Sequence, residues 1–325
     1  MTERPGPAAG KLQLRAPPRW HRLAEAVLRV LAFSAIAAIV LIFVFVAKEA
    51  LPLLWDEEIR REVTLAKMWF AQTWPDYDTA EHIWQPVSEA PKYAVWPLVV
   101  GTLKVTLVSM VVAVPLGVGS ALYVSQYAPA ALRELVKPAI ELLAGIPSVV
   151  LGFFALIVMA TWLQDHLGLE SRLNAIVAGV ALSFAIIPVI FTISEEALGA
   201  VPRSYVEAST ALGAAKWQTV LRVVLPAASP GVAAAIALGT GRAVGETMIV
   251  LMASGNAAIL SGSLTESVRT LSATIAAELA EVVFGGAHYT VLFLLGTLLF
   301  STTFVINSIG DWAIHRMKRR MGIVA

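Results

Sequence analysis

The chain has 325 residues, of which 58% are hydrophobic and 14% are charged, and its mean hydropathy is +0.74. Soluble proteins carry about 25% charged residues, so this composition predicts an integral membrane protein. The net charge of +1 says little about partners, because the positions of charges in a membrane protein matter more than their sum. The absence of cysteine excludes disulfides, thiol catalysis and cysteine-bound zinc. The five histidines lack metal-binding spacing, and we predict no metal site.

The N-terminal tail, residues 1–25, is rich in Pro, Gly and Arg, and we expect residues 1–21 to be unstructured. Basic residues precede the apolar run Val30–Ala47 and place this end in the cytoplasm: Arg4, Lys11, Arg15, Arg19, Arg22 and Arg29. Residues 26–47 are predicted to form the first span. The run is too long for a cleaved signal and no small-residue cleavage site follows it, so we expect the span to be retained.

Residues 48–95 form a long polar segment with nine acidic and five basic residues. Its acidic excess predicts an external position. Five tryptophans fall in it or directly after it: Trp55, Trp69, Trp74, Trp84 and Trp96. Anchoring at the membrane interface explains these rings more simply than the docking of another protein.

Apolar runs predict five further spans, at residues 96–124, 138–162, 173–193, 227–253 and 289–309. Lys104 lies early in the second span, where its side chain can reach the outer interface. Residues 271–284 are too short and too charged to span and predict a surface or re-entrant helix. Basic residues hold the C-terminal tail, 313–325, inside: Arg316, Lys318, Arg319 and Arg320. The expected fold is an all-α integral membrane protein with six transmembrane helices and both termini in the cytoplasm.

The segment 195–226 joins the fourth and fifth spans on the cytoplasmic side. Pro202 can begin a helix, Gly213 provides a joint, and Pro226 closes the segment, so we predict two short helices bent at Gly213. One side of these helices is expected to be apolar, from Val206, Leu212, Val220, Leu221, Val223 and Val224. The other side keeps charges for water: Glu207, Lys216 and Arg222.

This segment resembles the EAA loop by which permeases of ABC importers dock on their ATPase. The matching residues are Glu207, Ala208, Ser209, Gly213, Val223, Leu225 and Pro226. Ser209 departs from the family's second alanine, which is a change between small residues. An ordinary helix–glycine–helix loop is the alternative, but the whole pattern between two membrane spans favours the coupling role.

A second group of residues stands midway along the predicted span 227–253. Arg242 and Glu246 are four residues apart and would be neighbours on one helix face. Charges at this depth must face the bundle interior or water. They would form either a structural ion pair or a transient contact for an anion, in which Glu246 holds Arg242 when no substrate is present. Gly241 and Gly245 predict a face that a neighbouring helix can approach closely.

The run G-R-A-V-G-E-T-M, Gly241 to Met248, is similar to the signature of phosphate-specific permeases of ABC importers, and it is closer to the PstC type than to the PstA type. Two further runs are similar to the same family, at residues 145–153 and 187–198. The resemblance covers roughly residues 95–315 and makes 96–312 a permease core.

The resemblance implies the type I importer permease fold in the bacterial inner membrane. It implies inorganic phosphate as substrate, a PstA-like second permease, a PstB-like ATPase dimer and an external phosphate-binding protein. The substrate path would then include Arg242, Glu246, Thr247 and Ser148.

The chain has no phosphate-binding loop for ATP and no nucleophile elbow, so we expect no catalytic residues and no enzyme activity of its own. We expect it to bind no cofactor, with ATP used by the partner ATPase, and to contact lipid but no nucleic acid. A permease for sulfate, molybdate or phosphonate is one alternative. An ion-coupled secondary transporter, with Glu246 as the coupling carboxylate, is another, although no repeat is evident. A structural or signalling membrane protein would leave Arg242 and Glu246 unexplained.

Overall fold

The structure is a computed structural model that describes residues 19–74 and 78–320. Contacts within the chain divide it into two units, residues 1–45 and residues 46–325. The described part of the first unit belongs to helix α1 (Arg19–Ala50), a long apolar helix. Most of the segment expected to be unstructured, residues 1–18, lies outside the described residues, whereas residues 19–21 begin α1.

The described residues contain six helical stretches long and apolar enough to cross a membrane: Leu23–Leu54, Trp96–Gln126, Ser148–Leu167, Ala175–Gly199, Lys216–Gly245 and Ala287–Arg319. The predicted all-α membrane fold with six spans is therefore confirmed. The predicted boundaries are less accurate. In particular, the last helix runs to Arg320, so the tail predicted from residue 313 is helical up to that point.

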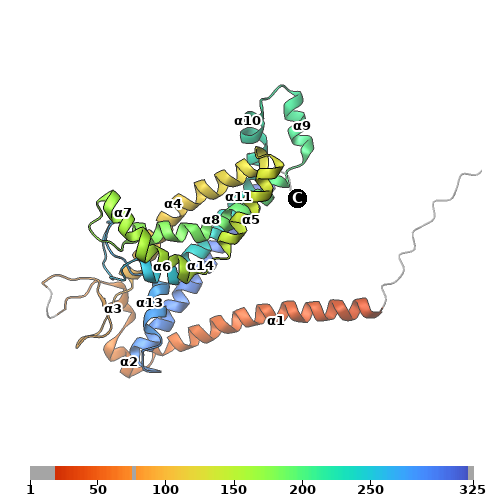
Figure 1. Ribbon diagram of the computed structural model, residues 1–325. Helices are drawn as coiled ribbons and strands as arrows, with labels where there is room; N and C mark the ends of the chain where they lie inside the picture. Colours follow the sequence, from red (N-terminus) through yellow and green to blue (C-terminus); the bar gives the residue numbers. More distant parts are fainter. Residues whose placement is uncertain (1–18, 75–77, 321–325) are drawn as a thin grey trace, which may run out of the picture. The chain divides into compact units, whose positions relative to one another are not determined.

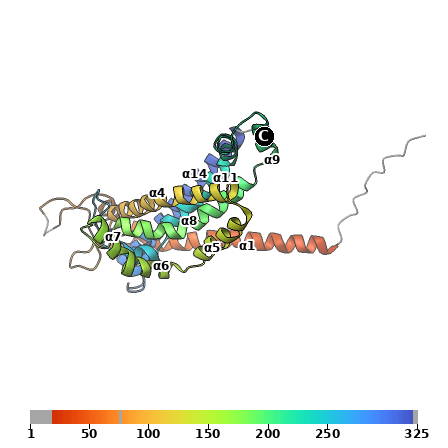
Figure 2. The ribbon, with the colours of Figure 1, turned by 45° about the horizontal axis from the view of Figure 1, so that its top comes forward.

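Four helices form the centre of the second unit and run beside one another in both views (Figures 1 and 2): α4 (Trp96–Gln126), α8 (Ala175–Gly199), α11 (Leu225–Gly245) and α14 (Ala287–Arg320). Small residues let their backbones approach. A Cβ atom at Gly117 of α4 would lie 2.8 Å from Ile190 of α8, and one at Gly239 of α11 would lie 2.9 Å from the same side chain. Ile190 therefore packs in a groove that two glycines keep open.

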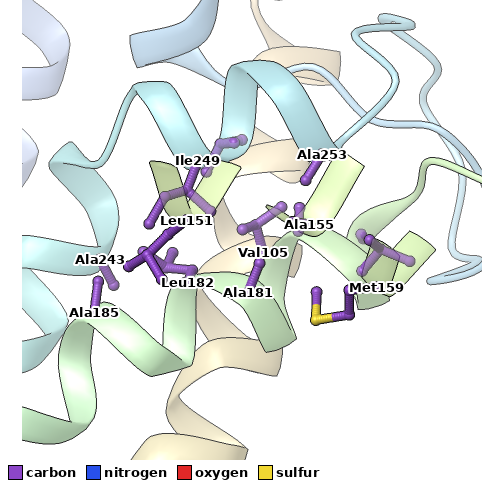
Figure 3. Packing of buried hydrophobic residues seen from close by; sticks show 14 of the residues in the cluster. Val105, Leu151, Ala155, Met159, Ala181, Leu182, Ala185, Ala243, Ile249 and Ala253 are labelled. Carbon is purple, nitrogen blue, oxygen red and sulfur yellow. The ribbon is translucent and has the colours of Figure 1, made fainter. Parts of the chain in front are cut away.

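The main apolar core joins these helices to shorter ones. Figure 3 shows side chains that converge from α4, α8, α11, α6 (Ser148–Phe154), the π-helical segment η2 (Ala155–Met159) and α12 (Met248–Ala253). Alanines are numerous among them, including Ala155, Ala181, Ala185, Ala243 and Ala253. Packing of small side chains is the main way that helices associate in a bilayer, where burial of apolar surface gives little gain.

The predicted third span, 138–162, is wrong at its beginning. Helix α5 (Ala130–Ala144) ends before Gly145, and the spanning stretch starts at Ser148, after Pro147. Pro147 is the residue that precedes α6 and starts it in an extended conformation. α5 is amphipathic and is held by polar contacts: Arg133 donates to the Ser125 carbonyl (2.8 Å), and Lys137 pairs with Glu195 of α8 (2.9 Å). It therefore lies outside the spanning part.

The segment 48–95 is folded, apart from residues 75–77, which lie outside the described residues. It contains η1 (Leu51–Leu54), α2 (Glu57–Glu62), α3 (Leu65–Trp69) and a hairpin of β1 (Trp84–Gln85) and β2 (Lys92–Tyr93), in which Trp84 pairs with Tyr93. Asp56 and Thr64 cap α2 and α3. A second core joins this segment to the start of α14.

The tryptophans of this segment do not all serve as interface anchors. Trp84 is buried in the second core, and Trp69 packs edge-on against Trp96 at 5.7 Å. Trp55 is exposed. The expectation of aromatic anchoring is therefore wrong for Trp84, because its ring stabilises the fold of the segment.

Two shorter helices complete the external side. α7 (Ala160–Leu167) ends at Gly168, which adopts a positive φ of 63°, and α13 (Leu271–Glu278) is the short helix expected within 271–284. Lys104 of α4 is buried, and its Nζ donates to the Ser263 carbonyl at 2.7 Å. The side chain thus ends at the backbone of the loop before α13.

We expect Gly101→Ala on α4 to destabilise the protein by about 1–3 kcal/mol, because its Cβ atom would overlap the Arg269 carbonyl oxygen. Gly119→Ala on the same helix is the matched control. No atom of the described residues lies within 4 Å of its Cβ position, and alanine favours a helix over glycine by about 1 kcal/mol. Thermal unfolding of the purified protein in detergent measures both. Equal unfolding midpoints for the two variants would contradict the close contact at Gly101.

Candidate functional site

The candidate site is a break in the chain directly after the fifth spanning stretch, Lys216–Gly245, which ends earlier than the predicted span 227–253. α11 ends at Gly245, Glu246 is extended (φ −67°, ψ 133°), and α12 begins at Met248. The Glu246 carboxylate accepts hydrogen bonds from the backbone N–H groups of Thr247 (3.1 Å) and Met248 (3.2 Å). The Thr247 hydroxyl donates to the Gly245 carbonyl (3.2 Å). The side chains at the break thus satisfy backbone groups that the interrupted helix leaves free.

This geometry corrects the predicted pairing of Arg242 with Glu246. The two residues do not share a helix face, because the helix ends between them and the Glu246 carboxylate turns to the start of α12. Within the described part of the chain, Arg242 forms no ion pair and no side-chain hydrogen bond, and it is exposed. The structural ion pair considered from the sequence is therefore not formed.

The two glycines of this region have different surroundings. A Cβ atom at Gly241 would lie 2.8 Å from the Asn307 side chain of α14, so this glycine serves close helix packing as predicted. Gly245 is exposed, and none of the described residues has an atom within 4 Å of its Cβ position. Gly245 and Arg242 are three residues apart on α11 and share one face. The described residues leave that face open.

α13 closes the other side of the break. The Ser272 hydroxyl donates to the Glu246 carbonyl (2.8 Å), and the Leu271 N–H donates to the Thr102 hydroxyl of α4 (3.1 Å). Thr247 and Ser272 line a cavity of about 430 Å³ whose remaining walls are apolar. The sequence did not predict that Ser272 and Thr102 belong to this region. Ser272 lies 26 residues from its partner Glu246 and Thr102 lies 169 residues from its partner Leu271, and no local sequence pattern connects residues so far apart.

Ser148 is the first residue of α6 and is half-buried. One turn further, a Cβ atom at Gly152 would lie 3.0 Å from the Met248 carbonyl oxygen, so α6 packs closely against α12. No hydrogen bond joins Ser148 to Arg242, Glu246 or Thr247. The structure therefore places Ser148 on a helix that contacts α12, without direct contact to those three residues.

The cytoplasmic segment forms the predicted helical hairpin. α9 (Arg203–Ala211) and α10 (Lys216–Thr219) are joined at Gly213, which adopts a positive φ of 80°. A side chain is strained in this conformation, which explains the glycine. The π-helical segment η3 (Val220–Val224) continues from α10 into α11. Figure 1 shows α9 and α10 at the end of the central helices opposite to α2 and α3.

Several matched residues of this hairpin have structural contacts. Ser209, which departs from the family pattern, lies 2.9 Å from the hydroxyl of the buried Thr219 and so ties α9 to α10. Glu207, Ala208 and Pro226 are exposed, whereas Val223 and Leu225 are half-buried.

The apolar side predicted for the hairpin is only partly correct. Val220 and Val224 are buried, but Leu212 is 89% exposed and Leu221 is 48% exposed. Tyr205 and Trp217 are also exposed. The charged side chains of Glu207, Lys216 and Arg222 are exposed as predicted. The described residues therefore leave an apolar surface on the hairpin, which we call the hairpin surface: Tyr205, Leu212, Trp217 and Leu221.

Known proteins are similar to this chain in sequence and in fold. Residues 113–322 match the family described as binding-protein-dependent transport system inner membrane component. YqgH of Bacillus subtilis (strain 168), described as a probable ABC transporter permease protein, is 35% identical over 68% of this chain and 72% of its own. The phosphate transport system permease protein PstC of Xylella fastidiosa (strain 9a5c) is 33% identical over 88% of this chain and 90% of its own.

Two solved structures share the fold. A chain of a bacterial alginate ABC transporter superposes with a TM-score of 0.57 at 15% identity, and the match covers 93% of this chain and 98% of that chain. A chain of the MetNI methionine ABC transporter superposes with a TM-score of 0.52 at 24% identity, and the match covers 69% of this chain and 94% of that chain.

Six spans, a broken helix and a cytoplasmic helical hairpin define a membrane permease subunit of an importer, a multi-pass protein of the bacterial inner membrane. Such a subunit is not an enzyme, and it works with a separate ATPase and a substrate-binding protein. The chain belongs to the family of binding-protein-dependent transport system inner membrane components and, within it, to the PstC-type permeases.

A double-mutant cycle checks the separation of Arg242 from Glu246. We expect the effects of Arg242→Gln and Glu246→Gln on the free energy of unfolding in mixed micelles to add within about 0.5 kcal/mol, because the two side chains do not touch. Glu246→Ala serves as the reference variant. It removes the acceptor of two backbone N–H groups and should cost about 1 kcal/mol, as loss of a helix cap does. A coupling energy well above 1 kcal/mol would show that the ion pair forms.

Proposed function

We propose that this chain forms half of the path of an ATP-driven importer of inorganic phosphate. The observation that carries the proposal is the exposed Arg242 guanidinium, which has no ion-pair or hydrogen-bond partner among the described residues and lies in the last turn of a membrane-spanning stretch, beside the break. Such a charge is costly against lipid, so the face that bears it must be covered by protein or water. A PstA-like second permease would complete the path on that face.

The face of α11 that carries Arg242 suits weak, reversible binding of an oxyanion during transport. A guanidinium offers planar, paired donors that match a phosphate. Glu246 lies four residues away and directs its carboxylate to the backbone of α12, so its negative charge remains near the path without neutralising Arg242. A fixed negative charge near the contact weakens anion binding and favours release. Thr247 supplies a hydroxyl at the break, and Ser148 lies on the neighbouring helix α6.

Energy would enter through the hairpin surface. A PstB-like ATPase dimer would cover Tyr205, Leu212, Trp217 and Leu221, since exposed apolar patches of this kind mark protein interfaces. The matched residues Glu207, Ala208, Ser209, Gly213, Val223, Leu225 and Pro226 form or support this hairpin. The hairpin continues through η3 into α11, which carries Arg242. Movement of the hairpin on ATP binding would therefore be transmitted to the substrate path through the continuous helix formed by α10, η3 and α11. On the external side, a phosphate-binding protein would deliver the substrate.

The relatives named as phosphate transport permeases support phosphate over sulfate, molybdate or phosphonate. The guanidinium itself does not distinguish these oxyanions, so substrate competition decides between them. An ion-coupled secondary transporter is disfavoured, because the hairpin surface would then have no partner.

Uptake of radiolabelled phosphate by cells that carry this chain and its transport partners tests the substrate. We expect unlabelled phosphate to compete, and sulfate, molybdate and phosphonate to have no effect. Arg242→Gln should lower uptake at least tenfold, the loss of roughly 1.4 kcal/mol or more, because the anion loses a charged contact. Arg242→Lys, which keeps the charge but not the paired donors, should retain part of the uptake. Competition by another oxyanion, or uptake that persists without the ATPase, would overturn the proposal.

Gly213→Asp tests the coupling role of the hairpin. The side chain would be strained at φ +80°, which costs about 1 kcal/mol and distorts the joint between α9 and α10. We expect normal membrane insertion but loss of phosphate uptake and of the ATPase stimulation that the loaded binding protein causes. Gly262→Asp, in the loop before α13 and outside the segment 195–226, is the control, since its Cβ position is open and its φ is not positive. Normal coupled uptake in the Gly213 variant would count against the ATPase contact.

A further inference from the structure

The second unit has a larger cavity, of about 850 Å³, between the segment 48–95 and the α13–α14 connection. The basic end of α14, with Arg316, Lys318 and Arg319, faces the cytoplasm, so the beginning of the same helix faces outside. The cavity is lined by residues from α2, the β1–β2 hairpin, α13 and the beginning of α14. It is therefore external and distinct from the break between α11 and α12.

The floor of this cavity is fixed and electrically balanced. Glu278, the last residue of α13, accepts hydrogen bonds from Arg269 Nη2 (2.5 Å) and Trp84 Nε1 (3.2 Å), and its other oxygen lies 2.9 Å from His288 Nε2. The Glu278, Arg269 and His288 side chains are each less than one-fifth exposed. These contacts join three parts of the chain, so the cavity has a preformed shape.

The walls carry carboxylates without cationic partners. Glu62 and Glu281 form no ion pair with any described residue. The Tyr93 hydroxyl donates to Glu62 at 2.6 Å. Burial raises the pKa of Tyr93, and the hydrogen bond to Glu62 and the charges of Glu62 and Glu278 raise it further, so the phenol stays protonated and acts as a donor. The surplus of negative charge disfavours an anion and favours an ammonium or guanidinium group.

The rim of the cavity is apolar and uncovered. Val87 and Val283 line the opening and are 87% and 81% exposed, and the neighbouring Phe284 is 80% exposed. Val87 belongs to the external β1–β2 hairpin, where water is otherwise the surrounding medium. An apolar rim around a charged hollow is the arrangement of a protein interface, in which apolar contacts exclude water from a central polar pair.

We propose that this cavity and its rim dock the external substrate-binding protein of the transport system, which inserts a lysine or arginine side chain between Glu62 and Glu281. The charge of the cavity and its external position select this partner. The proposal depends on the proposed function only for the existence of a substrate-binding protein, and it holds for any transported oxyanion.

Docking at this position also has a direct route to the path. The occupant would lie against the C-terminal end of α13, at Glu278 and Glu281, while the N-terminal end of α13 bonds to the Glu246 carbonyl through Ser272. α13 has eight residues, so the two ends are about 12 Å apart. Because α13 links the cavity to the break, binding of the partner in the cavity would change the position of α13 relative to Glu246.

The test is a binding measurement with the complete transporter complex in lipid nanodiscs and the purified, substrate-loaded binding protein. We expect Glu62→Gln combined with Glu281→Gln to weaken the dissociation constant about tenfold and to reduce its dependence on salt, as loss of charged interface contacts does. Glu89→Gln and Glu170→Gln are the controls, because both residues are exposed, predicted to be external and outside the cavity. Both controls should bind as the unmodified complex does.

Val87→Ser with Val283→Ser tests the rim and should weaken binding without changing the salt dependence. Basal ATPase activity and the unfolding midpoint should be unchanged in all variants, which separates lost docking from lost folding. Unchanged affinity in the Glu62 and Glu281 double variant would overturn the proposal, as would equal losses in the control variants. Binding is measured without uptake, so a failure of the phosphate assignment leaves this result independent.

Discussion

The structure depends on one constraint, which is that backbone groups freed inside a bilayer need partners from the protein. The fifth spanning stretch ends at Gly245, and three side-chain groups satisfy backbone groups at the break between it and α12. The Glu246 carboxylate binds two N–H groups, the Thr247 hydroxyl binds the Gly245 carbonyl, and the Ser272 hydroxyl binds the Glu246 carbonyl. The acidic side chain of Glu246 thereby becomes a structural element of the break, and Arg242 is left without an ion-pair partner among the described residues.

Helices α11 and α13 connect the break to the hairpin and to the external cavity. α11 carries Arg242 near its end and continues without interruption from the hairpin that bears Gly213. α13 connects the other side of the break to the external cavity. The central helices pack closely against one another through glycine and alanine contacts, as at Gly117 and Gly239 around Ile190. Elements that lead to the hairpin and to the external cavity thus meet at the same few residues around Glu246.

The sequence predicted the spans, the bend at Gly213 and the short helix at 271–284, because apolar runs, glycine and charge are local signals. It misplaced the start of the third span, since the apolar residues of α5 continue into the run that follows and only Gly145 and Pro147 mark the boundary. It also paired Arg242 with Glu246, because four-residue spacing implies a shared face only if the helix is continuous. The cavity around Glu278 joins residues that are nearly 200 positions apart, and no local pattern could have predicted it.

The π-helical segment η3 has a geometric consequence for the hairpin. A π-helical turn holds one residue more than the α-helical turn it replaces, and each residue of an α-helix turns the chain by about 100°. The π-helical turn Val220–Val224 therefore determines the direction, about the axis of α11, in which α9 and α10 project. The orientation of the hairpin relative to Arg242 therefore depends on one additional residue, and a single deletion in this segment would rotate the hairpin about the axis of α11.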